Sequence, residues 1–417
     1  MKELLVSILL LISMVTVEST VSLNYDVIYV GGSGPGNYTS IQEAVNIAQD
    51  NSIIYIYPGL YEEDVFIDKP LSLIGLKIDD EKPIIIGSSD STINITSNGC
   101  LLQNLVISNE NNNSVTLYHS NKTIIEYIVF INSSTHLKMI NSHSNTIRNN
   151  EFKNTVEGIT LFSSNYNHIK DNNLFLSEDE RIHGYGISLS SSNHNYLEDN
   201  NISTTIEYSN REFGIHLWNS SNNTIIDNEV NGSNFGIMIH SYSNYNNISY
   251  NNVHSNTGSG ISIQGGSNNI VRGNLVHDDK QWSGISILKS WSKNNLIVDN
   301  NVYDNLIGIH LQGTMNTIKH NTIKNNLEYG VYLDSWLSNC KMNTLEENNL
   351  MDNELNAYFQ VKPFSMNKWC DNYWSDWDSN LPKPIYGKLL VPITPFFGLT
   401  LPWITFDTQP VSSPNQG

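Results

Sequence analysis

A tetrapeptide of the form Gly-Ile/Val-x-Leu/Ile recurs every 22 to 28 residues through most of the chain. Its eight clear copies begin at Gly158, Gly186, Gly214, Gly236, Gly260, Gly284, Gly308 and Gly330. Alternation of apolar and variable residues has period two, which is the period of a β-strand and not of a helix. A unit this short cannot bury an apolar face alone, so its copies must stack on one another. The repeat therefore predicts a solenoid of β-coils.

Weaker copies of the tetrapeptide extend the pattern in both directions, beginning at Thr92, Ser114, His136 and Asn356. The competing 22-residue unit is the leucine-rich repeat, which carries a helical segment in each copy. The second half of each copy here is Asn plus Ile or Val, without helical apolar spacing. We therefore predict an all-β fold, a single-stranded right-handed parallel β-helix of about twelve coils with a short N-terminal capping helix.

Asparagine recurs in register with the repeat, at Asn172, Asn200, Asn228, Asn251, Asn274, Asn300, Asn321 and Asn348. In stacked coils these positions lie above one another. Asparagine suits tight turns because it tolerates left-handed backbone, and stacked asparagines form amide ladders. We interpret these residues as structural and not as a binding surface.

The two ends of the chain differ from the repeats. Residues 1–22 have the pattern of a secretory signal, with an apolar run too short to span a membrane. Ser40 and Glu43 form a capping box that opens a short helix ending near Ala48. We predict a β-helix with this cap over 23–365, and an aromatic and Pro-rich capping tail over 366–417. Its tryptophans would otherwise mark a ligand platform.

The chain carries 41 acidic and 22 basic residues, for a net charge of −19. This balance argues against nucleic acid and anionic membranes as partners. With the signal it indicates an extracytoplasmic protein, either periplasmic, cell-surface or secreted, without a membrane span once the signal is removed. The expected partner is a polysaccharide or another extracytoplasmic protein. Asn-x-Ser/Thr sequons are frequent, and Cys340 and Cys370 could pair, leaving Cys100 unpaired.

Several segments carry a resemblance to known proteins. Ile-Tyr-Ile-Tyr-Pro-Gly-Leu-Tyr at 54–61 and Leu-Ser-Leu-Ile-Gly at 71–75 resemble the opening of right-handed parallel β-helix proteins with a pectin-lyase-like fold. The Gly-Ile-x-Leu coils resemble the repeats of the family named for the periplasmic copper-binding protein NosD, an accessory of nitrous oxide reductase. Asn-Tyr-Trp-Ser-Asp-Trp at 372–377 resembles segments that end many such proteins. The resemblance implies metal handling, polysaccharide binding or polysaccharide cleavage, because the fold alone does not fix function.

Stacking of the repeat brings possible metal ligands together on the outward face of the Gly-Ile-x-Leu strand. His216 and Met238 occupy the same outward column on adjacent coils, and His240 follows two residues after Met238. Imidazole and thioether groups suit copper, especially Cu(I). The second strand of each coil offers another pair, His254 and His277, one coil apart. A solvated sheet face with mixed residues is the alternative to both sites.

The neighbouring outward column carries the aromatic residues Tyr118, Phe162 and Trp218. Such rings suit stacking against a sugar, and Trp282 lies in one of the longer turns that we expect at the edge of the same sheet. We therefore treat these four residues as candidate ligand-binding residues.

Three longer turns, at 178–183, 207–212 and 277–282, precede Gly-Ile-x-Leu strands. If they rim a catalytic groove, Asp278 and Asp279 are the candidate carboxylates for acid/base cleavage of a glycan, with Arg211 or Lys280 assisting. A lyase would also use Ca²⁺. Of the motifs typical of pectin hydrolases only Asp-Asp occurs, at 79–80 and 278–279. Ordinary acidic surface loops are the simpler interpretation.

These observations favour a secreted or cell-surface β-helix binding or scaffold protein that resembles the NosD family, with copper as a possible cofactor. The alternatives are a polysaccharide-active enzyme, either a lyase or a glycoside hydrolase, and a structural envelope or adhesin component.

Overall fold

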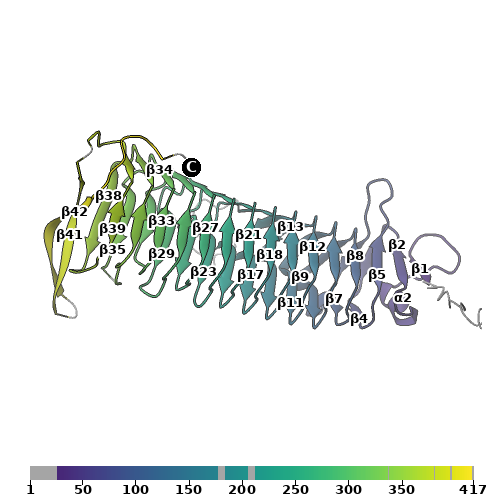
Figure 1. The fold of residues 1–417 in the computed structure, drawn as a ribbon. Helices are drawn as coiled ribbons and strands as arrows, with labels where there is room; N and C mark the ends of the chain where they lie inside the picture. The colour runs from purple at the N-terminus through teal and green to yellow at the C-terminus, as the bar shows by residue number, and fades with distance from the viewer. Residues whose placement is uncertain are drawn as a thin grey trace, which may run out of the picture.

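The computed structural model describes residues 26–176, 184–204, 212–336, 338–379, 381–394 and 397–415, which form one long stack of coils (Figure 1). The predicted all-β parallel solenoid is confirmed, but it has about 14 turns and not twelve. Coils before Thr92 and after Asn356 lack the tetrapeptide, yet they still pair in register, as β2 with β5 and β36 with β39 show. The signal predicted for residues 1–22 lies outside the described residues.

Each coil contributes strands to three parallel sheets, numbered in the order in which the chain meets them. Sheet one contains β1 (Val27–Val30), β2 (Ile53–Ile56), β5 (Ser72–Gly75), β8 (Leu101–Gln103), β10 (Ile124–Glu126), β12 (Thr146–Arg148), β15 (His168–Lys170), β18 (Tyr196–Glu198), β21 (Thr224–Ile226), β24 (Asn247–Ser249), β27 (Ile270–Arg272), β30 (Leu296–Val298), β33 (Thr317–Lys319), β36 (Thr344–Glu346) and β39 (Lys368–Cys370).

Sheet two contains β3 (Leu60–Glu62), β6 (Ile84–Ile86), the first parts of β9 (Val106–Tyr118) and β11 (Val129–Ile140), β13 (Glu151–Thr155), β16 (Asn173–Leu176), β19 (Asn201–Thr204), β22 (Glu229–Asn231), β25 (Asn252–His254), β28 (Leu275–His277), β31 (Asn301–Tyr303), β34 (Thr322–Lys324), β37 (Asn349–Met351) and β40 (Tyr373–Trp374).

Sheet three holds the Gly-Ile-x-Leu strands. It contains β4 (Val65–Ile67), β7 (Ser91–Ile95), the last parts of β9 and β11, β14 (Glu157–Phe162), β17 (Tyr185–Ser190), β20 (Phe213–Trp218), β23 (Phe235–His240), β26 (Ile261–Gln264), β29 (Ser283–Leu288), β32 (Ile307–Leu311), β35 (Tyr329–Asp334), β38 (Leu355–Val361) and β41 (Lys383–Thr394). The last strand, β42 (Phe397–Asp407), pairs antiparallel with β41.

The apolar residues of the repeat fill the interior of the stack. In β20, Ile215 and Leu217 are fully buried, and their partners one coil on, Ile237 and Ile239, are buried equally. The same alternation repeats in each coil, so the core runs along the whole rod. Stacked coils bury the face that a single coil would expose, as expected for a solenoid.

The repeat glycine is explained by close packing at the start of the strand. A Cβ on Gly236 would lie 2.4 Å from Val253 Cγ1 and 2.6 Å from the carbonyl oxygen of Gly260 in the next coil. Real Cβ atoms do not approach neighbours this closely, so only glycine fits without displacing the backbone.

The asparagine ladder is confirmed and extends beyond the predicted residues. We call it the inner ladder, and its members are Asn150, Asn172, Asn200, Asn228, Asn251, Asn274, Asn300, Asn321, Asn348 and Asn372. Each side-chain Nδ2 donates to the Oδ1 of the next member at 2.9–3.0 Å. The ladder ends on Asp407 of β42, whose Oδ2 accepts from Asn372 at 2.9 Å. All ten asparagines are buried, so the ladder satisfies polar groups that water does not reach.

Both ends of the stack are covered. Within the described residues the single helix is α2 (Ile41–Ile47), and Ser40 Oγ accepts from the backbone N–H of Glu43 as the capping box predicts. At the other end, β39 and β40 continue the stack past residue 365, and the hairpin of β41 and β42 follows it (Figure 1). Cys100, Cys340 and Cys370 are buried and unpaired. Among the described helices, none has the length and apolar character to cross a membrane.

Candidate functional site

Sheet three carries two outward columns, in the register that the sequence predicts. The first column includes Thr160, Ser188, His216, Met238 and Ser262, which pair in that order from coil to coil. The alternative interpretation of this column as a solvated face is wrong at most of these positions: Met238 is 5% exposed and Ser262 is fully buried. Alternation along a strand shows which way a side chain points, but not whether neighbouring side chains cover it.

His216, Met238 and His240 come together on adjacent strands, as predicted. His216 pairs with Met238 across β20 and β23, and the ring centroids of His216 and His240 lie 6.0 Å apart with the planes at 44°. The rings are tilted and not parallel. The Met238 thioether belongs to the same pair of coils, so two imidazoles and one sulfur share a small, mostly buried area.

Aromatic rings surround these three donors. His216 lies against Tyr185 and Phe213, with ring centroids 5.3 and 5.0 Å away, and His240 is perpendicular to Trp218 at 4.6 Å. Burial and the charge of Lys289 lower the pKa of His240. A lowered pKa keeps the imidazole neutral, with a lone pair available to a metal or a hydrogen-bond donor.

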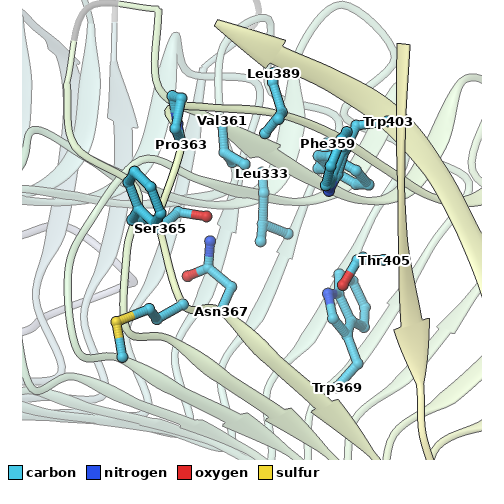
Figure 2. Close-up of a pocket in the computed structure, with 12 residues that line it drawn as sticks. Leu333, Phe359, Val361, Pro363, Ser365, Asn367, Trp369, Leu389, Trp403 and Thr405 are labelled. Atoms are coloured by element: carbon cyan, nitrogen blue, oxygen red, sulfur yellow. The ribbon is translucent and has the colours of Figure 1, made fainter. Parts of the chain in front are cut away.

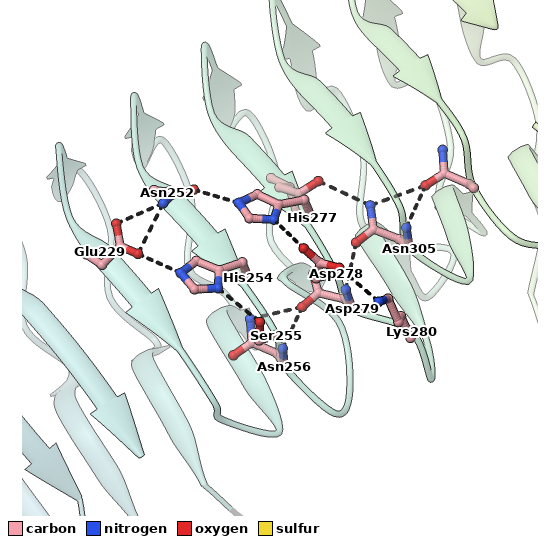
Figure 3. A network of polar contacts seen from close by, with 12 residues as sticks. Glu229, Asn252, His254, Ser255, Asn256, His277, Asp278, Asp279, Lys280 and Asn305 are labelled. Atoms are coloured by element: carbon pink, nitrogen blue, oxygen red, sulfur yellow. Dashed lines mark hydrogen bonds and ion pairs between the residues drawn. The ribbon is translucent and has the colours of Figure 1, made fainter. Parts of the chain in front are cut away.

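His254 and His277 are arranged differently (Figure 3). Their rings stack in parallel, with centroids 4.9 Å apart and planes at 7°. His254 lies 2.6 Å from Glu229 and 3.0 Å from Ser255 Oγ, while His277 lies 2.9 Å from Asp278 and 3.2 Å from Asn252 Oδ1. All four ring nitrogens therefore have protein partners. The two histidines form a hydrogen-bonded stack, and their nitrogens do not converge on one position where a metal ion could bind.

The predicted catalytic carboxylates point to different places (Figure 3). Asp278 lies at the surface, 2.9 Å from His277 and 3.1 Å from Lys280, and its pKa is lowered chiefly by the hydrogen bond from His277. Asp279 is fully buried, so it does not face a groove where a glycan could touch it. Arg211, predicted to assist, lies outside the described residues, as do the turns at 178–183 and 207–211.

Asp279 occupies a position in a further ladder. The backbone N–H of Asn256 donates to Asp279 Oδ1 at 2.7 Å, and the backbone N–H of Asp279 donates to Asn305 Oδ1 at 3.0 Å. Asn326 and Asn353 continue this ladder. Burial raises the pKa of Asp279 well above its usual range. The sequence did not show this role, because an acid next to another acid in a long turn is typical of a surface loop.

The second outward column carries the predicted ligand-binding aromatics. Tyr118, Phe162 and Trp218 are 46%, 43% and 46% exposed, whereas their neighbours one coil away, Ile140 and Ser190, are smaller. The fourth candidate, Trp282, is also exposed, but it precedes β29 and lies outside this column.

A polar cluster further along sheet three has no counterpart among the sequence-predicted sites. Asp334 Oδ2 lies 3.7 Å from His310 Nε2 and accepts from Gln312 at 2.7 Å, and Tyr332 stacks on His310 at 5.1 Å. Burial opposes ionisation of Asp334, but the neighbouring His310 imidazole and the hydrogen bond from the backbone N–H of Trp336 leave its pKa lowered. Burial also raises the pKa of Tyr332. The signal in the sequence was His310 and Asp334 in neighbouring outward columns.

A pocket of about 390 Å³ lies at the C-terminal end, between the last coils and the hairpin (Figure 2). Phe359, Trp369 and Trp403 line it together with aliphatic side chains. Trp369 of β39 and Trp403 of β42 therefore line an apolar hollow at this end of the stack.

Comparison with known proteins identifies the repeat. The profile of the family described as periplasmic copper-binding protein (NosD) matches residues 75–257 and 242–379, which together span most of the chain. The chain belongs to the NosD family. No curated protein matches the sequence.

Solved structures similar to this NosD-family chain share its fold at low sequence identity. The A-module of mannuronan C-5 epimerase AlgE4 from Azotobacter vinelandii is 13% identical, with a TM-score of 0.53 over 78% of this chain and 93% of that one. Tailspike protein 3 of bacteriophage CBA120 is 13% identical, with a TM-score of 0.55 over 87% and 66%. The DFA-IIIase of Arthrobacter chlorophenolicus A6 is 12% identical, with a TM-score of 0.51 over 77% and 94%. These likenesses establish the parallel β-helix.

The copper-binding description of the NosD family can be tested against the donors present. Among the described residues, no group of three or more His, Cys, Asp or Glu side chains is placed to hold a metal ion. A site for Cu(I) does not need such a group, because thioether sulfur and neutral imidazole are ligands that it prefers. His216, Met238 and His240 supply that combination on two adjacent strands.

Proposed function

We propose that this protein is an extracytoplasmic copper-binding β-helix whose copper ligands are His216, Met238 and His240. The observation that carries the proposal is the pairing of His216 with Met238 in register, beside a His240 whose pKa is lowered. Soft and neutral donors in a mostly buried, aromatic-lined area favour Cu(I) over hard cations such as Ca²⁺.

Each residue has a distinct part in this proposal. His216 and His240 would hold copper through ring nitrogens, and Met238 would supply the sulfur that favours the reduced ion. Tyr185 and Phe213 beside His216, and Trp218 beside His240, orient the rings and limit the access of water. Copper, when bound, would supply a thiophilic, redox-active centre suited to transfer between proteins.

The test is competition for Cu(I) between the full chain and a chromophoric chelator under reducing conditions. We expect one copper bound with micromolar or tighter affinity. Binding should be lost in His216→Ala/His240→Ala, while Met238→Leu, which keeps the volume, should weaken Cu(I) far more than Cu(II).

The matched control is His254→Ala/His277→Ala, which also removes two histidines from adjacent coils. Copper binding that survives the first double substitution but not this control would contradict the proposed ligand set, and absence of binding by the unaltered chain would reject the copper function. The polysaccharide-active enzyme is the weaker proposal, because Asp279 is buried and Asp278 is held by His277 and Lys280.

A further inference from the structure

The second outward column of sheet three alternates with a period of two coils. The residues on every second coil are Tyr118, Phe162, Trp218, Gln264, Gln312 and Gln360. Three are aromatic and three are amides. The coils between them carry Ile140, Ser190, His240, Leu288 and Asp334, of which none is an amide and only His240 has a ring. The period of the surface is therefore twice the period of the fold.

The three aromatic side chains of this column are restrained by neighbouring residues and remain exposed. Tyr118 is perpendicular to His119 at 4.4 Å, Trp218 is perpendicular to His240 at 4.6 Å, and Lys138 Nζ lies 5.9 Å from the ring of Phe162. Each ring thus has a neighbour that restrains it, and each remains more than two-fifths exposed. Restrained, exposed rings lose little entropy when a flat ligand stacks on them.

The spacing selects the ligand. Strands in adjacent coils lie ~4.8 Å apart, so rings on every second coil lie ~9.6 Å apart along the rod. In an extended β-1,4-linked glycan every second pyranose ring presents the same face, at a separation comparable with this one. Beyond Trp218 the amides continue the same phase, and amide groups donate to and accept from sugar hydroxyls.

The charge of the protein narrows the class further. The net charge is −19, and the six residues of the column are uncharged. A polyanionic glycan would therefore meet repulsion that Lys138, beside Phe162, offsets only locally. We infer that the second outward column of sheet three binds a neutral, linear β-1,4-linked polysaccharide along the rod, one disaccharide for every two coils. This inference rests on the aromatic and amide residues of the column and not on the proposed copper site, although the two sites adjoin where Trp218 contacts His240.

The experiment measures binding of neutral β-1,4-linked oligosaccharides to the full chain by calorimetry, from the disaccharide to the hexasaccharide. We expect affinity to rise with length, because the rings from Tyr118 to Trp218 span ~19 Å. Single changes Tyr118→Ala, Phe162→Ala and Trp218→Ala should each raise the dissociation constant about three- to tenfold. Tyr250→Ala is the control, since Tyr250 is also an exposed aromatic residue, 58% exposed, but lies outside this column, after β24.

A relocation variant tests the two-coil spacing itself. Phe162→Ser/Ser190→Phe keeps the number of aromatic residues but moves one ring by a single coil. Loss of hexasaccharide affinity in this variant, with an unchanged circular dichroism spectrum, supports the inference. Unchanged affinity would overturn it, and so would tighter binding of an oligouronate than of the neutral hexasaccharide. No detectable binding of any neutral oligosaccharide would also overturn it, while leaving copper binding by His216, Met238 and His240 untouched.

Discussion

From Asn150 to Asn372 the inner ladder places the same side chain in every coil, whereas the second outward column changes residue type at each coil. Both follow the same stack and the same strand spacing. Inside, each amide must donate to the amide above it, so any other residue leaves a buried polar group without a partner. Outside, water satisfies whatever the neighbours do not. The residues of the inner ladder are therefore determined by the fold, whereas the residues of the outward columns can vary with function.

The largest effect should come from a break in the inner ladder. The Asn251 side chain donates to the carbonyl oxygens of Ile225 and Ser249 and to Asn274 Oδ1, and it accepts from the backbone N–H of Asn228. Asn251→Ala removes these partners in a dry environment, where each unsatisfied group costs about 1–3 kcal/mol. We expect a loss of about 3–5 kcal/mol in the free energy of unfolding, measured by chemical denaturation.

The neighbouring residue gives the matched control for that experiment. Asn252 lies at the surface of β25, where its amide donates to Glu229. Asn252→Ala should cost less than about 1 kcal/mol. Equal losses at the two positions would show that the inner ladder has no special weight.

The repeat glycine should give the next largest effect. Gly236→Ala places a Cβ 2.4 Å from Val253 Cγ1, and overpacking of this kind costs about 1–3 kcal/mol. At Gly59 the nearest atom to a new Cβ is 3.6 Å away, so Gly59→Ala should change the free energy of unfolding by less than about 1 kcal/mol. Thermal unfolding of the two variants compares them directly. If Gly236→Ala left the free energy of unfolding unchanged, adjacent coils would have to separate easily to make room for the added Cβ.

Asp279 offers a smaller and pH-dependent change, because it is the acid in a ladder of amides. Burial raises its pKa in the folded state, so folding favours the protonated form. At pH values below about 3.9, the ordinary pKa of an aspartic acid in the unfolded chain, Asp279 is protonated in both states and does not lower the free energy of unfolding. As pH rises above that value the unfolded chain ionises first, and stability is lost until the folded pKa is passed.

Asp279→Asn should remove this loss. We expect the variant to be more stable than the natural chain at neutral pH, by on the order of 1 kcal/mol or more, and the advantage to shrink as pH falls toward 3.9. Urea denaturation at several pH values measures the difference. A difference that does not change with pH would contradict the assignment of Asp279 as a buried neutral acid.

The smallest effect is expected in the outward column. Gln264 is half-buried and donates to Ser262 Oγ at 3.3 Å. Gln264→Ala should change the free energy of unfolding by less than about 0.5 kcal/mol. A loss as large as that of Asn251→Ala would erase the contrast between the two columns.

The repeat was enough to predict the fold and the register, down to the pairing of His216 with Met238. This succeeded because a two-residue period fixes the side of the strand and the coil period fixes the neighbour. The sequence could not show whether neighbouring side chains cover a residue that points outward, and Ser262 is buried although it points outward.

The sequence also did not predict contacts between residues that are not register partners in adjacent coils. His254 is bound by Glu229, which lies in the preceding coil but aligns with Asn252 and not with His254. Asp279 was taken for a surface acid because nothing in its local sequence shows that an asparagine ladder passes through it. Both cases depend on diagonal contacts between coils, which the order of residues along one strand does not contain.

The period of two coils on the outer surface has a consequence for how such chains lengthen by duplication. Insertion of one whole coil leaves every buried contact intact, since each coil presents the same asparagines and aliphatic residues to the next. The same insertion before Gln264 would shift all later surface residues by one coil. Gln264 would then lie an even number of coils from His240 and an odd number from Trp218, the reverse of the present arrangement. Chains of this kind can therefore gain or lose pairs of coils and keep a continuous surface, while an odd number divides it into two shorter ones.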